Sequence, residues 1–272
     1  MSLLVKAANG QRLVSVTPES AGWHYVGFEA LRLAASESIS LAPEDREVCI
    51  IVLEGTVSVD AAGQVYREIG ERRSVFEERS PFAVYVPSPG PIRIDAHTDA
   101  EVAIASAPAG DSASARLIEP QQMKRSVRGI GSNQRFICDI LPETEPAAHL
   151  LVVEVRTPGG HSSSYPPHKH DCDDLPRESA LEETYYHRIN PPQGFVFQRV
   201  YTDDRVLDES MAVENRDLVM VPRGYHPVVV PHGYESYYLN VMAGKKRMWQ
   251  FRNDPAHEWM LHASPARPAA AS

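Results

Sequence analysis

The sequence predicts an all-β chain built from two similar β-domains in tandem. Short runs of alternating apolar and polar residues recur along its whole length, as is typical of half-buried strands. The 22 prolines and 16 glycines separate these runs, and helical periodicity is weak. A strand, a Val-Pro pair, a glycine-containing turn and a return strand follow one another once in each half, which indicates a duplicated domain.

The first half contains four clear strand signals. Residues 49–53 form a short apolar run that a glycine ends, and residues 56–60 alternate directly after it. Residues 82–86 form a strand closed by proline, and residues 92–95 alternate once more. Only residues 27–35 of this half, and a segment near the C-terminus, suggest a short helix.

The second half has a denser strand pattern. Strands are expected at residues 150–156, 184–189, 195–201, 218–221, 228–230 and 237–242. Ala, Ser, Gly and Pro cluster over residues 107–126, so we place the domain boundary there, giving domains of residues 1–115 and 116–272. The low-complexity tail, residues 264–272, is expected to fray.

Size and charge narrow the classes of protein. A chain of 272 residues with 43% hydrophobic residues can bury one or two cores. The formal net charge of −9 argues against nucleic acid and anionic membranes as partners. No apolar run could span a bilayer, and the first residues lack a signal-peptide core. Three widely spaced cysteines (Cys49, Cys138 and Cys172) indicate a reducing compartment, so we expect a cytoplasmic protein.

The most informative motif is a His-x-His triplet, His168-Lys169-His170. Residues i and i+2 of a strand point to the same face, so both imidazoles can enter one cavity. One carboxylate and one more imidazole would complete a set of nitrogen and oxygen ligands for a divalent metal that still leaves room for substrate. Cys172 lies nearby and could be a ligand, but a loop thiol without a role is the simpler interpretation.

Two positions compete for the carboxylate. Glu182 and Glu183 are neighbours, so only one can face the cavity, and we prefer Glu183 because it directly precedes the strand at residues 184–189. For the third imidazole we prefer His226, which follows a glycine turn, over its rival His232. The histidines that we take as non-ligands are His149, His161, His187, His257 and His262.

Arg199 and Tyr201 are the candidate substrate-binding residues. They alternate with Phe195 and Phe197 on one strand face, which could be the face of the metal cavity. The guanidinium of Arg199 would suit a carboxylate. A surface ion pair is an equally good interpretation of Arg199. The first half has no His-x-His, so we expect its domain to lack metal ligands.

The order of these ligands resembles the two cupin motifs: His-x-His, then Glu, then Pro-x-Gly-x-His. Cupins are small antiparallel jelly-roll barrels that hold a metal inside. The resemblance, together with the duplication, implies a bicupin. One departure is that residues 171–182 form a longer insertion between His170 and Glu183 than most cupins have.

The insertion points to a narrower resemblance. Tyr165-Pro166-Pro167-His168-Lys169-His170-Asp171 and Val221-Pro222-Arg223-Gly224-Tyr225-His226-Pro227 are similar to the 5-deoxy-glucuronate isomerase family of bacterial myo-inositol catabolism. Further similar blocks are residues 181–195, 198–203, 237–244 and 253–259. A related family, 5-keto-4-deoxyuronate isomerase, has a Glu followed two residues later by Tyr, which favours Glu183 because Tyr185 follows it.

The resemblance implies an aldose–ketose isomerase that converts 5-deoxy-D-glucuronate to 2-deoxy-5-keto-D-gluconate by a metal-assisted cis-enediol mechanism. The expected ligands are His168, His170, Glu183 and His226, with zinc as the first choice among zinc, Mn, Fe, Co and Ni. Candidates for moving the proton are Glu183, Tyr185, Tyr238 and, as an alternative, His187.

The expected partner is a small sugar acid, and the chain is expected to form a homo-oligomer. Two other functions use the same barrel: an Fe(II)-dependent cupin dioxygenase and a non-catalytic sugar-binding cupin.

Overall fold

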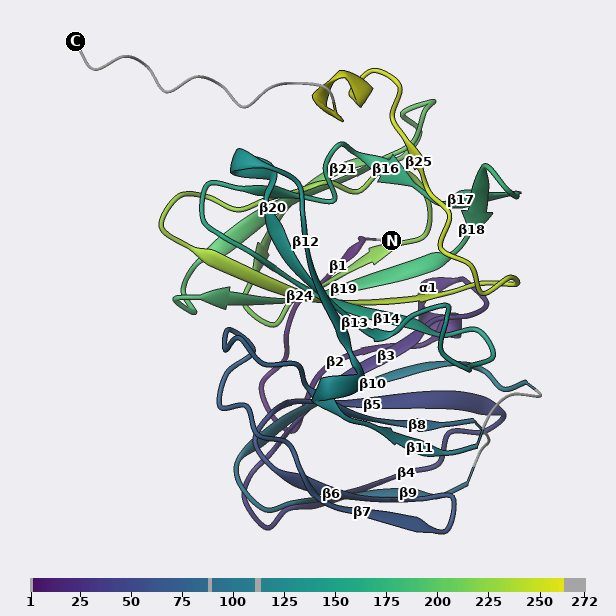
Figure 1. Cartoon of the computed structure of the whole chain (residues 1–272), viewed down its shortest axis with the longest axis vertical. Helices are drawn as coiled ribbons and strands as arrows, with labels where there is room; N and C mark the ends of the chain where they lie inside the picture. The colour runs from purple at the N-terminus through teal and green to yellow at the C-terminus, as the bar shows by residue number, and fades with distance from the viewer. Residues whose placement is uncertain (1, 88–89, 111–113, 262–272) are drawn as a thin grey trace.

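The computed structural model describes residues 2–87, 90–110 and 114–261. Two β-barrels are stacked along the long axis of the molecule (Figure 1). Each barrel pairs one large sheet with a four-stranded sheet. The described residues contain one α-helix, α1 (Pro18–Ala21), and three short 3-10 helices, η1 (Pro120–Gln122), η2 (Gly131–Asn133) and η3 (Glu258–Leu261). The prediction of an all-β chain with two tandem barrels is confirmed.

The first barrel encloses an aliphatic core. The order of its large sheet is β11 (Arg116–Ile118), β8 (Phe82–Val86), β5 (Arg46–Glu54), β10 (Ala100–Pro108), β3 (Gly27–Leu33) and β2 (Arg12–Val16). The order of its small sheet is β4 (Ser38–Leu41), β9 (Ile92–Ala96), β6 (Val57–Ala61) and β7 (Gln64–Ile69). Alternate side chains of β5, namely Val48, Ile50 and Val52, fill the interior.

The second barrel carries the predicted motifs. The order of its large sheet is β1 (Leu4–Val5), β22 (Leu218–Val221), β19 (Glu182–Asn190), β24 (Glu235–Ala243), β14 (Leu151–Thr157), β13 (Arg135–Leu141) and β12 (Lys124–Arg128). The order of its small sheet is β15 (Ser162–Ser163), β23 (Val228–Val229), β20 (Phe195–Tyr201) and β21 (Asp208–Glu214). Two short ladders pair β16 (His168–Lys169) with β25 (Arg252–Asn253), and β17 (Asp171–Asp174) with β18 (Glu178–Ala180).

The two barrels repeat one topology. The order β8-β5-β10-β3-β2 in the first large sheet matches β22-β19-β24-β14-β13 in the second. Strand pairing also crosses the division that we place between residues 115 and 116. β1 pairs with β22 of the second barrel, and β11 pairs with β8 of the first. The position of the domain boundary stays a prediction.

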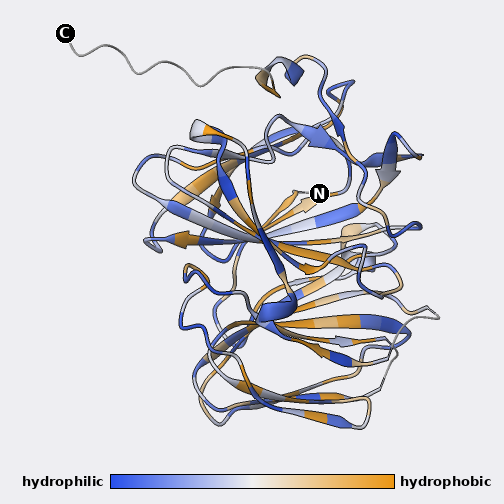
Figure 2. Ribbon diagram, viewed as in Figure 1, coloured by the Kyte–Doolittle hydropathy of each residue, from blue (hydrophilic) through white to orange (hydrophobic). Residues whose placement is uncertain are grey.

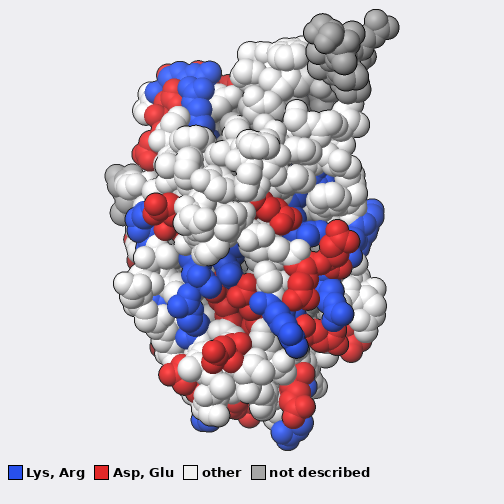
Figure 3. Space-filling model, turned by 90° about the vertical axis from the view of Figure 1, so that its left-hand side faces the viewer, with Lys and Arg blue, Asp and Glu red and all other residues white. Residues whose placement is uncertain are grey.

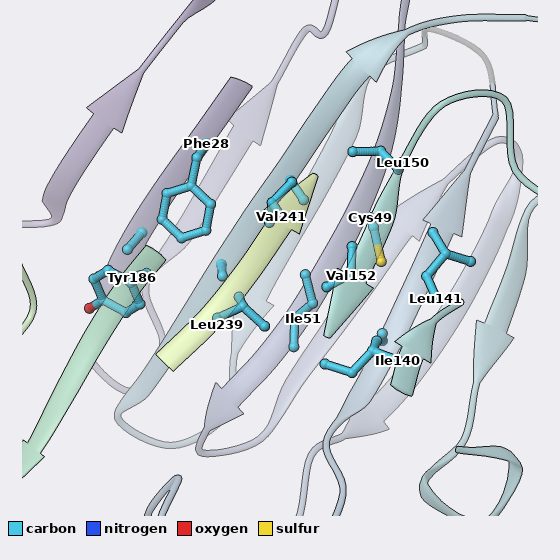
Figure 4. Close-up of a cluster of buried hydrophobic side chains, with 14 of the residues drawn as sticks. Phe28, Cys49, Ile51, Ile140, Leu141, Leu150, Val152, Tyr186, Leu239 and Val241 are labelled. Carbon is cyan, nitrogen blue, oxygen red and sulfur yellow. The ribbon is translucent and has the colours of Figure 1, made fainter. Parts of the chain in front are cut away.

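The large sheets lie against each other and share one apolar core. Residues of both halves contribute to it, and Figure 4 shows Phe28 of β3 beside Tyr186 of β19. Their ring centroids are 5.5 Å apart. Apolar strands therefore run through the middle of the molecule as well as through each barrel (Figure 2). The second barrel's large sheet thus has Glu183 of β19 on its inner face and this shared core on the other.

A buried ion pair crosses the shared core. Arg72, from the first half, donates from Nη1 to the two carboxylate oxygens of Glu154 at 3.0 and 2.9 Å. Tyr237 donates its hydroxyl to the same carboxylate at 3.0 Å. The side chain of Arg72 is 2% exposed and that of Glu154 is 8% exposed, so both charges depend on each other for compensation.

One local prediction is wrong. Residues 27–35 were expected to be helical, but residues 27–33 form strand β3. The segment contains good helix formers, and its pairing with β2 and β10 outweighs that weak preference. The long central strand β10 carries little sequence signal because four of its nine residues are alanine.

Candidate metal centre

Three buried histidines meet inside the second barrel. His168 lies on β16, His170 follows that strand, and His226 lies between β22 and β23. Their ring nitrogens lie within 4.8 Å of one another. Gly224 makes the turn before His226, with φ of 90°. A Cβ at this position would lie 2.5 Å from the carbonyl oxygen of Tyr201, so the close approach requires glycine.

The carboxylate of Glu183 completes the cluster. Its Oε2 lies 3.1 Å from Nε2 of His170 and 3.2 Å from Nε2 of His226. Its Oε1 accepts a hydrogen bond of 2.6 Å from Nδ2 of Asn240, on the neighbouring strand β24. The structure therefore brings together His168, His170, Glu183 and His226, the four predicted ligands.

The hydrogen bonds of the imidazoles suit a metal. Nδ1 of His226 lies 2.9 Å from the carbonyl oxygen of Gly224, and Nδ1 of His170 lies 3.2 Å from that of Leu181. A His226 ring that donates through Nδ1 keeps its Nε2 lone pair for a cation, whereas Nε2 of His170 is hydrogen-bonded to Oε2 of Glu183. Nε2 of His226 is buried and has no hydrogen-bond partner among the described residues. This set of three imidazoles and one carboxylate fits a divalent metal ion.

The surroundings favour neutral imidazoles at two positions. Burial lowers the pKa of His168 well below its ordinary value, and the neighbouring His226 and His170 add to the effect. Burial also lowers the pKa of His226. For His170, burial acts in the same direction, but the hydrogen bond and charge of Glu183 outweigh it and raise the pKa. A neutral ring is the form that binds a metal.

Glu182 points away from the histidines. Its carboxylate accepts hydrogen bonds from the backbone N–H groups of His24, Tyr25 and Val26 at 2.6, 2.7 and 3.0 Å. Because successive residues of a strand face opposite sides, Glu182 fastens β19 to the first half while Glu183 enters the barrel. His232, the rival of His226, is exposed in the turn before β24.

A cavity of about 270 Å³ opens beside the cluster, with His168 and Glu183 in its wall. Tyr185 and Tyr238 also line it, with ring centroids 4.9 Å apart. The hydroxyl of Tyr185 lies 2.9 Å from Oγ of Ser164, and that of Tyr238 is hydrogen-bonded to Ser163. Burial raises the pKa of both tyrosines, so both phenols keep their protons at neutral pH.

The structure does not place Arg199 and Tyr201 in this cavity. Arg199 forms a two-pronged ion pair with Asp208, with both N–O distances at 2.7 Å, and its side chain is 44% exposed. The hydroxyl of Tyr201 donates to Asp254 at 2.8 Å, and both candidates line a separate cavity of about 230 Å³. The prediction that Arg199 and Tyr201 share a strand face with the metal cavity is wrong. The inward side chains of β20 are instead Val196, Gln198 and Val200.

Two arginines that the sequence did not single out line the metal cavity. Arg135 begins β13 and donates from Nη1 to the backbone oxygen and Oδ1 of Asn133 at 3.0 and 3.2 Å. Arg128 ends β12 and lies with its guanidinium carbon 5.3 Å from the ring centroid of Trp249. No strand was predicted for either segment, so alternation gave no signal for these residues.

The insertion between the ligands is an ordered hairpin, β17–β18. The ammonium of Lys169 contacts Asp171 at 2.5 Å and Glu178 at 3.2 Å. Asp171 also accepts the backbone N–H of Gly224 at 2.8 Å, so the hairpin supports the turn that carries His226. Cys172 is exposed on this hairpin, outside the histidine cluster. Asp171, Cys172 and Glu178 lie close together, and the ammonium of Lys169 contacts both carboxylates.

Comparison with known proteins identifies the family. The profile of the KduI/IolB family matches residues 3–260. The chain belongs to the KduI/IolB family. A 5-deoxy-glucuronate isomerase of Geobacillus kaustophilus is 52% identical over 251 residues, which cover 92% of this chain and 91% of that protein. A 5-deoxy-glucuronate isomerase of Bacillus subtilis is 49% identical over 258 residues, covering 94% and 95%. The predicted family is thereby confirmed.

Solved structures agree with the predicted bicupin fold of this KduI/IolB protein. An IolB-like protein from Salmonella typhimurium superposes with a TM-score of 0.94 at 48% identity, covering 96% of this chain and all of that one. Oxalate decarboxylase from Lactobacillus farciminis has a TM-score of 0.62 at 11% identity, covering 97% and 91%, and shows the fold alone. Across the described part of the chain, no helix has the length and apolar character needed to cross a membrane.

Proposed function

We propose that this chain is an aldose–ketose isomerase that converts 5-deoxy-D-glucuronate to 2-deoxy-5-keto-D-gluconate in myo-inositol catabolism. The observation that carries the proposal is the cluster of three imidazoles and Glu183 beside a cavity that two protonated tyrosines line. The names of the family members support it, since relatives that match nearly the whole chain are called 5-deoxy-glucuronate isomerase.

His168, His170, Glu183 and His226 would hold the metal, for which we propose zinc. Mn, Fe, Co and Ni accept the same nitrogen and oxygen donors. When bound, the ion would supply Lewis-acid polarisation of the substrate's carbonyl and of the neighbouring hydroxyl. Asn240 orients the carboxylate of Glu183 through the hydrogen bond to Oε1.

The reaction moves one hydrogen between two carbons without a net change of redox state. The C2–H bond of the open-chain aldose breaks, a cis-enediol forms, and a C1–H bond forms in the ketose. A base must take the proton from C2 and return it to C1. We assign this role to Glu183, because the phenols of Tyr185 and Tyr238 are held in their protonated form.

The two tyrosines are then hydrogen-bond donors. Their hydroxyls lie in the cavity wall, each already oriented by a serine. They would donate to the substrate oxygens, on which negative charge develops in the enediol. His187, the alternative base, does not line the cavity, and its Nε2 lies 2.9 Å from Oε1 of Gln198.

The partner that fits this site is a small sugar acid. Charges of both signs are interspersed on the face drawn in Figure 3, and no continuous basic field covers it. That pattern gives no reason to propose nucleic acid as a ligand. A cytoplasmic location and a homo-oligomer stay predictions from the sequence.

A proton NMR assay in D₂O tests the proposal. The protein is mixed with 5-deoxy-D-glucuronate as purified, after chelation, and after adding back zinc or each of the other four metals. We expect the aldehyde and hemiacetal signals to fall, a ketone product to form, and deuterium to enter the substrate-derived carbons, in a metal-dependent way. Oxygen uptake without isomerisation would instead support the cupin dioxygenase. Binding without turnover or oxygen uptake would support the sugar-binding protein.

A further inference from the structure

Two guanidinium groups in the candidate metal cavity form no ion pair among the described residues, and the only described carboxylate that acts on either is Asp139, at a distance beyond an ion pair with Arg128. Arg128 and Arg135 face each other in the register of the β12–β13 pair, and both line the cavity. Neither forms an ion pair with a described carboxylate. Arg199, in contrast, is neutralised by Asp208 outside the cavity. Two arginines and one carboxylate, Glu183, thus line the cavity, which leaves it with an excess of positive charge although the chain carries a net charge of −9.

Arg135 is the better placed of the two. Its Nη1 is held by the oxygens of Asn133, and its other N–H groups have no hydrogen-bond partner among the described residues. The side chain is only partly exposed. These N–H groups are not among the buried unsatisfied atoms of the described residues, so they are open to water and are available to a ligand that enters the cavity. Arg128, beside it, is kept in place by its stacking on Trp249.

We propose that Arg135, with Arg128 beside it, forms a subsite that binds the carboxylate of the sugar acid. The planar guanidinium of Arg135 offers two parallel N–H groups to the two oxygens of a carboxylate. An open-chain uronic acid has its aldehyde and its carboxylate at opposite ends, so separate groups must hold the two ends. The identity of the substrate, though not the charge preference, rests on the proposed function.

The subsite also explains selectivity for charge. A neutral aldose would leave both guanidinium groups in the cavity without a counter-ion, and the resulting loss of solvation would disfavour its binding. Lysine in place of Arg135 would keep the charge but not the two parallel donors. Comparing lysine and glutamine at position 135 therefore separates the contribution of the positive charge from that of the two parallel donors.

Binding is measured first, without turnover. D-glucuronate is titrated into the zinc-loaded and the chelated protein, with D-glucose as the neutral comparison, and tryptophan fluorescence is recorded because Trp249 lines the cavity. We expect Arg135→Gln to weaken D-glucuronate binding on the order of 10- to 100-fold in both forms, the loss typical of a charge-assisted hydrogen-bond pair. Weak binding of D-glucose should not change.

Three further variants sharpen the test. Arg135→Lys should retain part of the affinity, and Arg128→Gln should weaken D-glucuronate less than Arg135→Gln does. Arg177→Gln is the matched control, because Arg177 is exposed on the β17–β18 hairpin and pairs with Asp174. Circular dichroism and zinc content report on folding. If Arg135→Gln does not fold, the D-glucuronate affinities of Arg135→Lys and Arg128→Gln are compared with that of the wild type. Wild-type affinity in both variants would then overturn the subsite.

The kinetic outcome separates this inference from the proposed function. If the wild type isomerises 5-deoxy-D-glucuronate, Arg135→Gln should raise its KM by a similar factor while zinc content stays at the wild-type value. Unchanged KM and unchanged D-glucuronate affinity would overturn the subsite and leave the isomerase intact. Charge-selective binding through Arg135 without any isomerisation would overturn the proposed function and leave the subsite intact.

Discussion

Asn240 fixes which oxygen of Glu183 faces the histidines. Its Nδ2 donates over 2.6 Å to Oε1, and Oε2 is left beside the imidazoles of His170 and His226. Both residues are buried, at 3% and 2% exposure, so water cannot replace the amide readily. A residue outside the proposed ligand set therefore orients one of the proposed ligands.

Asn240→Ala should weaken metal binding without removing a ligand. Loss of a group that orients a ligand costs about 10- to 100-fold in metal affinity. Competition with a chromophoric chelator measures that affinity directly. Asn9→Ala, at an exposed position of the first half, is the control. An Asn240→Ala protein with wild-type affinity would show that the hydrogen bond has no influence on the site.

The neighbours Glu182 and Glu183 should respond differently to the same substitution. Glu183→Ala removes a proposed ligand, so we expect loss of bound metal in elemental analysis after gel filtration. Glu182→Ala should keep the metal but lower the free energy of unfolding by about 1–3 kcal/mol, because three backbone N–H groups lose their acceptor. Metal loss in both variants, or in neither, would contradict the assignment of faces on β19.

Replacing only one partner of the Arg72–Glu154 ion pair should lower the free energy of unfolding more than the pairwise replacement would suggest. Arg72→Met leaves a buried carboxylate without a cation and should lower the free energy of unfolding by about 3–5 kcal/mol. The double substitution Arg72→Met with Glu154→Leu should cost clearly less than the sum of the single changes. Urea unfolding of the four proteins measures the coupling, and strictly additive losses would disprove it.

Because His187 is buried, we expect the free energy of unfolding to decrease as the pH is lowered. Burial lowers the pKa of its ring to about 4 in the folded protein. The unfolded chain takes up a proton below its ordinary pKa of about 6.5, so stability is lost as pH falls from there toward 4. The full loss is about 3 kcal/mol, from 1.36 kcal/mol for each pKa unit. Above pH 7 this histidine has no effect.

Urea unfolding of wild type and His187→Gln between pH 7 and 4.5 tests this dependence. The wild type should lose more stability than the variant over that range, because glutamine cannot titrate. Other titrating groups are common to both proteins and cancel in the difference. Parallel curves for the two proteins would show that His187 is not held neutral.

The sequence predicts best where alternation and spacing act together. The strand signals at residues 195–201 and 218–221 match β20 and β22 residue for residue. The alternation at the start of β19 separates Glu182 from Glu183, and both faces are occupied as the pattern indicates. The glycine turn before His226 is likewise visible in the sequence, because its backbone conformation demands glycine.

Alternation does not tell which face of a strand is inside. In β20, alternation correctly places Arg199 and Phe197 on the same face. Phe197 is 51% exposed, however, so this face is the outer one, and the alternate side chains of β20 point into the barrel. Arg128 and Arg135 escaped notice for a different reason. Arg128 ends the polar edge strand β12, which has no periodic signal, and only the register of β12 on β13 brings it opposite Arg135 at the cavity.

The shared core has a consequence for the history of this chain. The first copy, whose interior is filled by aliphatic side chains, carries none of the predicted metal ligands. It could not be discarded, since its sheet covers the back of β19 and its first residues supply the edge strand β1. Selection for the proposed reaction would therefore act on both copies, on the proposed ligands in the second and on the packing of the shared core in the first.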